Sequence, residues 1–126
     1  MEMKKVSTDK APSAIGPYSQ AVIAGGLVYT SGQIAINPVS GQVEAEGIEA
    51  QTEQVMKNLG AVLESAGSSY DKAIKTTCFL AEIADFATFN AVYGKYFTGK
   101  PARSCVAVKD LPKGVLVEVE VIAIVD

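Results

Sequence analysis

The chain has 126 residues, which is the length of one ordinary domain, and we expect a single domain over residues 1–126. Apolar residues make up 48% of it and charged residues 20%, proportions that exclude a disordered chain. The formal net charge of -3 argues against nucleic acid as a partner, and the lack of histidine excludes histidine-based nucleophilic sites and histidine-ligated zinc within the chain.

Targeting and membrane signals are weak in this sequence. The first residues, Met1–Val6, are charged and contain no apolar core of a secretory signal. The longest apolar-rich stretch, Val115–Val125, contains two glutamates and is too short to span a bilayer. The two cysteines, Cys78 and Cys105, lack CxxC spacing and fit a reducing compartment. We therefore expect a cytoplasmic protein with no membrane partner.

The first half of the chain predicts a hairpin and a helix. Apolar runs at Ser19–Ala24 and Leu27–Ile34 flank Gly25-Gly26, a two-residue turn signal that is typical of a β-hairpin. From Gly47 to Ala66 the apolar residues recur with helical spacing, and Gly67 follows as the expected C-terminal glycine. An amphipathic helix is predicted here.

The second half alternates strands with a second helix. Ile74–Leu80 reads as a strand, and Asp85–Phe97 as a helix with an aromatic stripe and Asp85 as its N-cap. Strands at Ser104–Val108 and Val115–Val125 complete the chain. The two helical crossovers imply parallel strand pairs, with both helices on one face of a single sheet, and so predict a two-layer α/β sandwich.

The final strand indicates how the sheet is covered. Its odd positions, 115 to 125, are all apolar and should lie under the helices. Its even positions combine Glu118 and Glu120 with Leu116, Ile122 and Ile124. So much aliphatic surface on the second face suggests cover by another subunit, although a partly apolar, exposed face is the alternative.

Arg103 is the only arginine in the chain. A guanidinium can hold a carboxylate through two parallel hydrogen bonds, whereas a structural ion pair with Glu118 or Glu120 is equally compatible with the sequence. Strand parity predicts that Arg103 and Cys105 share a face with the two glutamates. A hairpin of the last two strands would even set Arg103 opposite Glu120, so that an anion clamp would lie near a carboxylate able to activate water.

Three further groups are candidates with competing interpretations. Tyr18 follows a Gly-Pro turn that could project its phenol. Gly32, in the Thr30–Ile34 segment, marks either a bulge, which we favour, or the close approach of a ligand. Cys105 could be a nucleophile, but without histidine it is better explained as a small apolar filler. Glu118 is best explained as a solvated or interface charge.

Several segments together resemble the RidA (YjgF, L-PSP) family, in order and over nearly the whole chain. They are Gly16–Ala21, Thr30–Ile34, Asn58–Leu59 with Ala66–Gly67, Lys75–Thr77 with Phe79–Leu80, Phe86–Asn90, Pro101–Val106 and Val117–Ala123. The resemblance implies a chorismate-mutase-like α+β fold with a mixed sheet, assembled as a homotrimer with sites in the clefts between subunits. It also implies that another strand separates the last two strands, which replaces the hairpin but leaves Arg103 and Glu120 on a shared face.

The resemblance further implies a deaminase that hydrolyses 2-imino acids such as 2-iminobutanoate and 2-iminopropanoate to 2-oxo acids and ammonia. Arg103 would bind the substrate carboxylate with the Gly32 N–H, and Glu120 would activate water. Tyr18, Ser31, Cys105 and Asn90 would contact the substrate. Such a substrate is already electrophilic, so neither a metal nor a cofactor is required. The alternatives are a regulatory trimer that binds small carboxylates without turnover, and a ribonuclease, against which the acidic charge argues.

Overall fold

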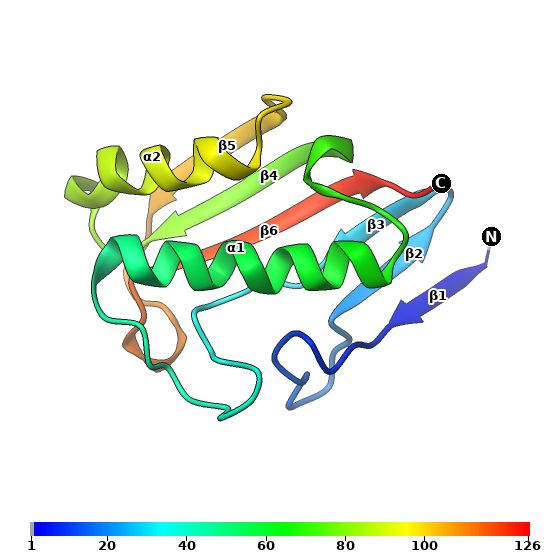
Figure 1. Ribbon diagram of the computed structural model, residues 1–126, viewed down its shortest axis with the longest axis horizontal. Helices are drawn as coiled ribbons and strands as arrows, with labels where there is room; N and C mark the ends of the chain where they lie inside the picture. Colours follow the sequence, from blue (N-terminus) through cyan, green and yellow to red (C-terminus); the bar gives the residue numbers. More distant parts are fainter. Residues whose placement is uncertain (1) are drawn as a thin grey trace.

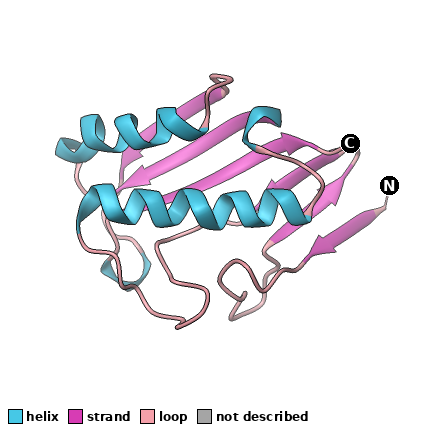
Figure 2. Ribbon diagram, viewed as in Figure 1, coloured by secondary structure: helices cyan, strands magenta, loops and turns pink. Residues whose placement is uncertain are grey.

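The computed structural model describes residues 2–126 as one sheet with helices packed on it (Figure 1). The strands in chain order are β1 (Met3–Val6), β2 (Ala21–Ala24), β3 (Leu27–Thr30), β4 (Ala73–Leu80), β5 (Ala102–Ala107) and β6 (Val117–Ile124). The helices are α1 (Gly47–Ser65) and α2 (Phe86–Tyr96), with short 3-10 turns at Tyr70–Lys72, Ile83–Asp85 and Pro112–Gly114. Both α-helices cover the same face of the sheet, as predicted (Figure 2).

The sheet is mixed, with the strand order β1-β2-β3-β6-β4-β5. The predicted β2–β3 hairpin is confirmed, and β4 and β5 pair in parallel. Strand β6 lies between β3 and β4 and is antiparallel to both, so the crossover through α1 joins strands that are not paired, and the parallel pair expected there is wrong. The hairpin of the last two strands is therefore wrong, whereas the separation that the family resemblance implied is correct. Strand β1 was not predicted, because only Val6 of its four residues is buried and it shows no apolar alternation.

The core lies between the sheet and the helices. The odd positions of β6 from Val117 to Ala123 are at most 1% exposed, as their alternation predicted. Helix α1 buries the apolar side chains Val55, Met56, Leu59, Val62 and Leu63 against them. This continuous apolar contact is the main stabilising feature of the fold.

The ends of the helices follow the sequence only in part. Gly67 has a φ of 82° directly after α1, and the Ser68 N–H donates to the Leu63 carbonyl at 2.8 Å, which is the expected glycine-dependent ending. Asp85 does precede α2, but it makes no side-chain capping hydrogen bond. Within residues 2–126, neither helix is long and apolar enough to cross a bilayer.

Two buried amides hold the loops that neighbour the candidate site. Asn58 on α1 donates to the carbonyls of Ile34 and Ile36, both at 3.0 Å, and so fixes the segment after β3. Gln20 donates to the Thr8 and Pro12 carbonyls at 3.0 and 2.7 Å. These bonds tie the segment after β3 to α1, and the segment before β2 to the N-terminal loop.

Candidate functional site

Arg103 is held under helix α2 at the free edge of the sheet. Its Nη1 donates to Asn90 Oδ1 at 2.6 Å. The guanidinium carbon lies 4.9 Å from the ring centroid of Tyr93 and 5.5 Å from that of Phe86, so cation–π contacts support it on two sides. Tyr93 shares a buried 2.7 Å hydrogen bond with Thr76 on β4. The guanidinium is therefore oriented by three side chains of α2, and one of these is anchored to the sheet.

A surface cavity of about 420 Å³ opens beside this arginine. Its lining includes Arg103, Asn90 and Tyr93, together with Phe97, Thr98 and the cationic Lys100. Two cations, an amide and aromatic walls in one concave site are suited to a small organic anion. This cavity is the Arg103 part of the candidate site.

The parity prediction for β5 is wrong. Arg103 pairs with Thr76, which in turn pairs with the buried Val121, so Arg103 faces the helices. Glu120 pairs with Thr77 and lies on the opposite, helix-free face. The prediction failed because it assumed that the apolar positions of β5 point into the core. At this edge the apolar Val106 lies on the helix-free face and is 47% exposed, and α2 supplies the aromatic and amide groups that accommodate a guanidinium on the core side.

Cys105 lies on the same face as Arg103, two residues further along β5. It is partly exposed and is directly in register with the fully buried Cys78 of β4. Burial raises the pKa of the Cys105 thiol, and the charge of Arg103 partly opposes that rise. The site therefore does not present Cys105 as an activated thiolate, in agreement with its interpretation as a filler.

The other predicted site residues form a second group, around β6 and the segment after β3. Five residues from Tyr29 to Gln33 face four from Ile122 to Val119, so one extra residue bulges within Thr30–Gly32, in agreement with the favoured interpretation of this glycine. The Glu118 carboxylate lies directly against Gly32: a Cβ there would sit 2.8 Å from Glu118 Cδ. A side chain at this position would therefore have to displace the Glu118 carboxylate.

The carboxylates of this second group differ in environment. Glu120 is exposed, whereas Glu118 is half-buried. Burial, and then repulsion from the charge of Glu120, raises the pKa of Glu118 above its usual range. Glu118 is thus more than a solvated surface charge, and this environment could not be inferred from alternation alone.

Ser31 and Tyr18 border the same group. The Ser31 hydroxyl donates to the Ser19 carbonyl at 2.6 Å, which leaves its oxygen lone pairs as acceptors. Tyr18 is 54% exposed, and its N–H donates to the Gly16 carbonyl at 2.9 Å in the predicted turn. The predicted site residues therefore fall into two groups, here called half-sites: Arg103, Asn90 and Cys105 on the helix side, and Glu120 with Gly32 and its neighbours elsewhere.

Sequence reasoning missed Phe86 and Tyr93 as parts of the arginine site. Both belong to the aromatic stripe of α2 that was interpreted as core. The useful signal is their spacing with Asn90, at i, i+4 and i+7, which places all three on one helix face.

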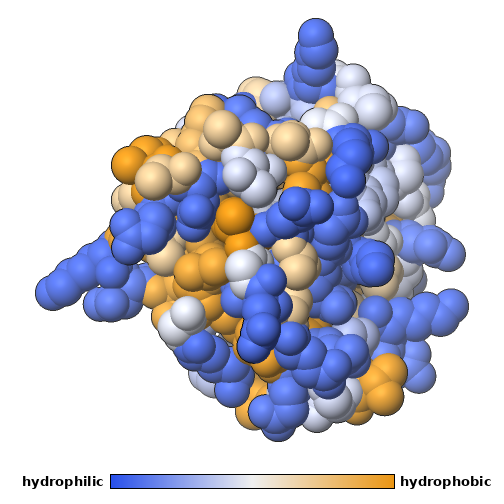
Figure 3. Space-filling view, turned by 60° about the vertical axis from the view of Figure 1, so that its left-hand side comes forward, coloured by the Kyte–Doolittle hydropathy of each residue, from blue (hydrophilic) through white to orange (hydrophobic). Residues whose placement is uncertain are grey.

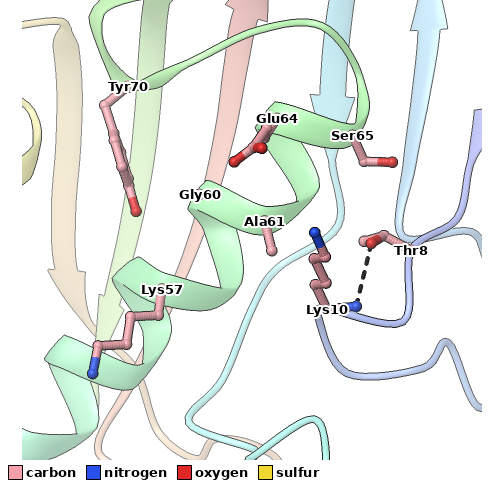
Figure 4. A pocket seen from close by; sticks show the side chains of 8 residues that line it. All are labelled: Thr8, Lys10, Lys57, Gly60, Ala61, Glu64, Ser65 and Tyr70. Atoms are coloured by element: carbon pink, nitrogen blue, oxygen red, sulfur yellow. Dashed lines mark hydrogen bonds between the residues drawn. The ribbon is translucent and has the colours of Figure 1, made fainter.

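The largest cavity lies away from both half-sites, on the outer surface of α1 (Figure 4). It measures about 540 Å³ and is bounded by α1, the N-terminal segment and Tyr70, with Lys10 pointing into it. None of the predicted site residues lines it. Its lysines and Glu64 are flexible surface charges, so we assign the candidate site to the Arg103 cavity despite its smaller volume.

Comparison with known proteins identifies relatives along nearly the whole chain. A family model described as "Endoribonuclease L-PSP" matches residues 8–125. A Lactococcus lactis protein named "Putative regulator AldR" is 57% identical over 96% of this chain and 97% of its own. The rat protein named 2-iminobutanoate/2-iminopropanoate deaminase is 48% identical over 96% of this chain and 89% of its own. The structure of Escherichia coli TdcF with bound serine is 42% identical, has a TM-score of 0.91, and covers 98% of this chain and 99% of that one.

Proposed function

Because this chain belongs to the RidA (YjgF, L-PSP) family, we propose that it is a deaminase that hydrolyses 2-imino acids, 2-iminobutanoate and 2-iminopropanoate among them, to 2-oxo acids and ammonia. The observation that carries the proposal is the oriented guanidinium of Arg103 at an open cavity, a feature suited to the carboxylate of such a substrate. The serine bound to TdcF supports a small, amino-acid-like ligand in this fold.

We propose that the complete site forms between copies of the chain, in a homotrimer. A single chain cannot direct Arg103 and Glu120 to one small molecule, because they lie on opposite faces of the sheet. The helix-free face leaves Tyr29, Val106 and Ile124 43–47% exposed, which favours cover by another copy. In the view of Figure 3, apolar side chains gather on one side of the molecule among hydrophilic ones. A head-to-tail arrangement of copies would close as a ring with equivalent sites.

In this site the substrate carboxylate pairs with Arg103 of one copy and also accepts a hydrogen bond from the Gly32 N–H. Glu120 of a neighbouring copy accepts a proton from water, which attacks the electrophilic imine carbon. The nitrogen of the resulting tetrahedral adduct takes up a proton and leaves as ammonia, and the carbonyl of the 2-oxo acid forms. Tyr18 and Ser31 contribute polar contacts, and Asn90 and Cys105 line the carboxylate end.

The chain's own groups suffice for this chemistry. An imine adds water readily, so orientation and one carboxylate base can supply the required acceleration without a metal or cofactor. The two free cysteines fit a reducing cytoplasm as the place where the reaction occurs.

The test is deamination of an imine generated in place by a serine or threonine dehydratase. The wild-type protein should hasten formation of the 2-oxo acid, whereas Arg103→Ala and Glu120→Gln should not. Lys109→Ala, beyond the end of β5, serves as a matched surface control. If the wild-type protein leaves the decay of the imine unchanged, the proposed activity is wrong.

The relationship to AldR favours a second candidate, a regulatory trimer that binds small carboxylates in the same cavity without turnover. Such a protein would use Arg103 to bind the carboxylate but would not need Glu120. Saturable binding of a 2-oxo acid that survives Glu120→Gln, together with no deamination, would support this candidate.

The ribonuclease activity in the description of the family model is less compatible with this chain. The net charge of -3 disfavours a phosphate backbone, and no histidine is present to act as general acid or base. We expect no RNA binding at any ionic strength.

A further inference from the structure

Cys78 and Cys105 form a dithiol on neighbouring strands that the proposed reaction does not use. They are paired in register on the parallel strands β4 and β5, and both side chains point to the helix side. Adjacent strands lie about 4.8 Å apart, within the Cα separation that a disulfide allows. The backbone therefore already holds the two cysteines at bonding range.

The surroundings of the two thiols differ in a way that sets their order of reaction. Cys78 is 0% exposed and donates weakly to Thr76 Oγ1 at 3.9 Å. Burial, followed by the neighbouring Cys105, raises the pKa of Cys78 to about 12. Cys105 is partly exposed beside Arg103; burial raises the pKa of its thiol, and the Arg103 charge opposes part of that rise. An oxidant from solvent therefore reaches Cys105 first, and Cys78 is the thiol that lies next to the oxidised Cys105.

We propose that Cys78 and Cys105 are a modification site, at which a peroxide closes a reversible disulfide between β4 and β5. The Cys105 thiolate attacks one oxygen of hydrogen peroxide and, with one proton taken up, gives a sulfenic acid and water. The sulfur of Cys78 then attacks the Cys105 sulfur, its proton is released, and the hydroxyl leaves as a second water. The two thiols lose two electrons and two protons in total, and the peroxide is reduced to water.

The location of the bond suggests why it would be readily reversed. Cys105 is partly exposed, so a reducing thiol from solvent can reach the bond, and exposed disulfides are the more easily reduced ones. A reducing compartment would keep the dithiol open until peroxide appears. Formation of the disulfide would also remove the free thiol of Cys105, which lines the Arg103 side of the site.

The experiment treats the purified, folded protein with hydrogen peroxide, then unfolds it and alkylates the free thiols. Trypsin separates the two cysteines, because cleavage after Lys75, Lys95, Arg103 and Lys109 puts them in peptides 76–95 and 104–109. The wild-type protein should lose both alkylatable thiols together, lose the mass of two hydrogens, and yield these peptides as a linked pair. Dithiothreitol should restore both thiols.

The Cys78→Val variant provides the matched control, because valine suits a buried strand position of similar volume. Here Cys105 should proceed to the sulfinic acid, which dithiothreitol does not reverse. The proposal is overturned if the wild-type protein oxidises Cys105 while Cys78 remains alkylatable, if its disulfide joins two copies, or if Cys78→Val shows the same reversible loss. Because the readout is mass, the result does not depend on deaminase activity.

Discussion

Arg103 and Glu120 face opposite sides of one sheet: Arg103 lies on the edge strand beneath α2, and Glu120 lies on a central strand with no helix above it. The proposed anion anchor and the proposed base therefore lie two strands apart and on opposite faces of the sheet. Under the proposed function the two groups can act on one substrate only across the interface between copies of the chain. This relationship decides which experiments are informative.

Arg103→Lys should raise KM for the imino acid roughly tenfold, since it loses about 1.5 kcal/mol of charge-assisted hydrogen bonding. An ammonium retains the charge but cannot donate to Asn90 and to a carboxylate as a planar fork, nor stack on Tyr93. Steady-state kinetics in the dehydratase-coupled assay measure the change. A lysine variant with unaltered KM would mean that charge alone holds the substrate.

Two glycine-to-alanine variants should change stability in opposite directions. At Gly60 in α1, a Cβ would lie 2.8 Å from Tyr70 Cζ, and Tyr70 cannot easily move because its hydroxyl donates to the Met56 carbonyl at 2.6 Å and its ring packs edge-on against Phe97. Gly60→Ala should therefore lower the free energy of unfolding by about 2 kcal/mol.

The exposed Gly94 in α2 is the matched control. A Cβ at this position would have nothing within 4 Å of it, so Gly94→Ala should raise the free energy of unfolding by roughly 0.5–1 kcal/mol. Denaturant unfolding at fixed protein concentration measures both variants. Equal stabilities for the two would refute the tight contact between Gly60 and Tyr70.

Glu118 should make stability depend on pH in a defined direction. Its pKa is raised in the folded protein, first by burial and then by Glu120, so the folded state binds more protons than the unfolded state above the ordinary value of 4.5. The free energy of unfolding should therefore fall as pH rises from there through the folded pKa, and stay level beyond it.

Glu118→Gln should remove this pH dependence and become the more stable protein at neutral pH, while matching the wild type in acid. Thermal unfolding at a series of pH values measures the difference. Glu46→Gln, at an exposed position that makes no capping hydrogen bond, is the control and should follow the wild-type curve. A Glu118→Gln advantage that shrinks toward neutral pH would contradict the assignment.

Periodicity and turn residues were sufficient to predict most of the fold. The stripe of α1, the Gly25-Gly26 turn and the alternation in β6 each reflect a single local constraint, and the structure confirms all three. Strand order was harder, because the insertion of β6 between β3 and β4 depends on pairing between distant segments. It was recovered only through family resemblance.

The candidate site was predictable by residue type but not by face. The lone arginine and the bulge at Gly32 were identified from the sequence. The side of the sheet on which Arg103 lies was not, because β5 has apolar surface on both sides and polarity no longer indicates the core. The groups that orient Arg103 come from α2, and only their tertiary contact with β5 distinguishes them from ordinary core aromatics.

Mixing two inactive variants tests most directly whether the half-sites of different copies combine. Arg103→Ala and Glu120→Gln subunits, each inactive alone, are unfolded together in equal amounts, refolded and assayed for deamination. With sites shared between neighbours, half of the sites have an intact arginine and half of those meet an intact glutamate, so about a quarter of wild-type activity should return. No activity above that of the separate variants, from a mixture that has reassembled, would contradict a site built from Arg103 of one copy and Glu120 of the next.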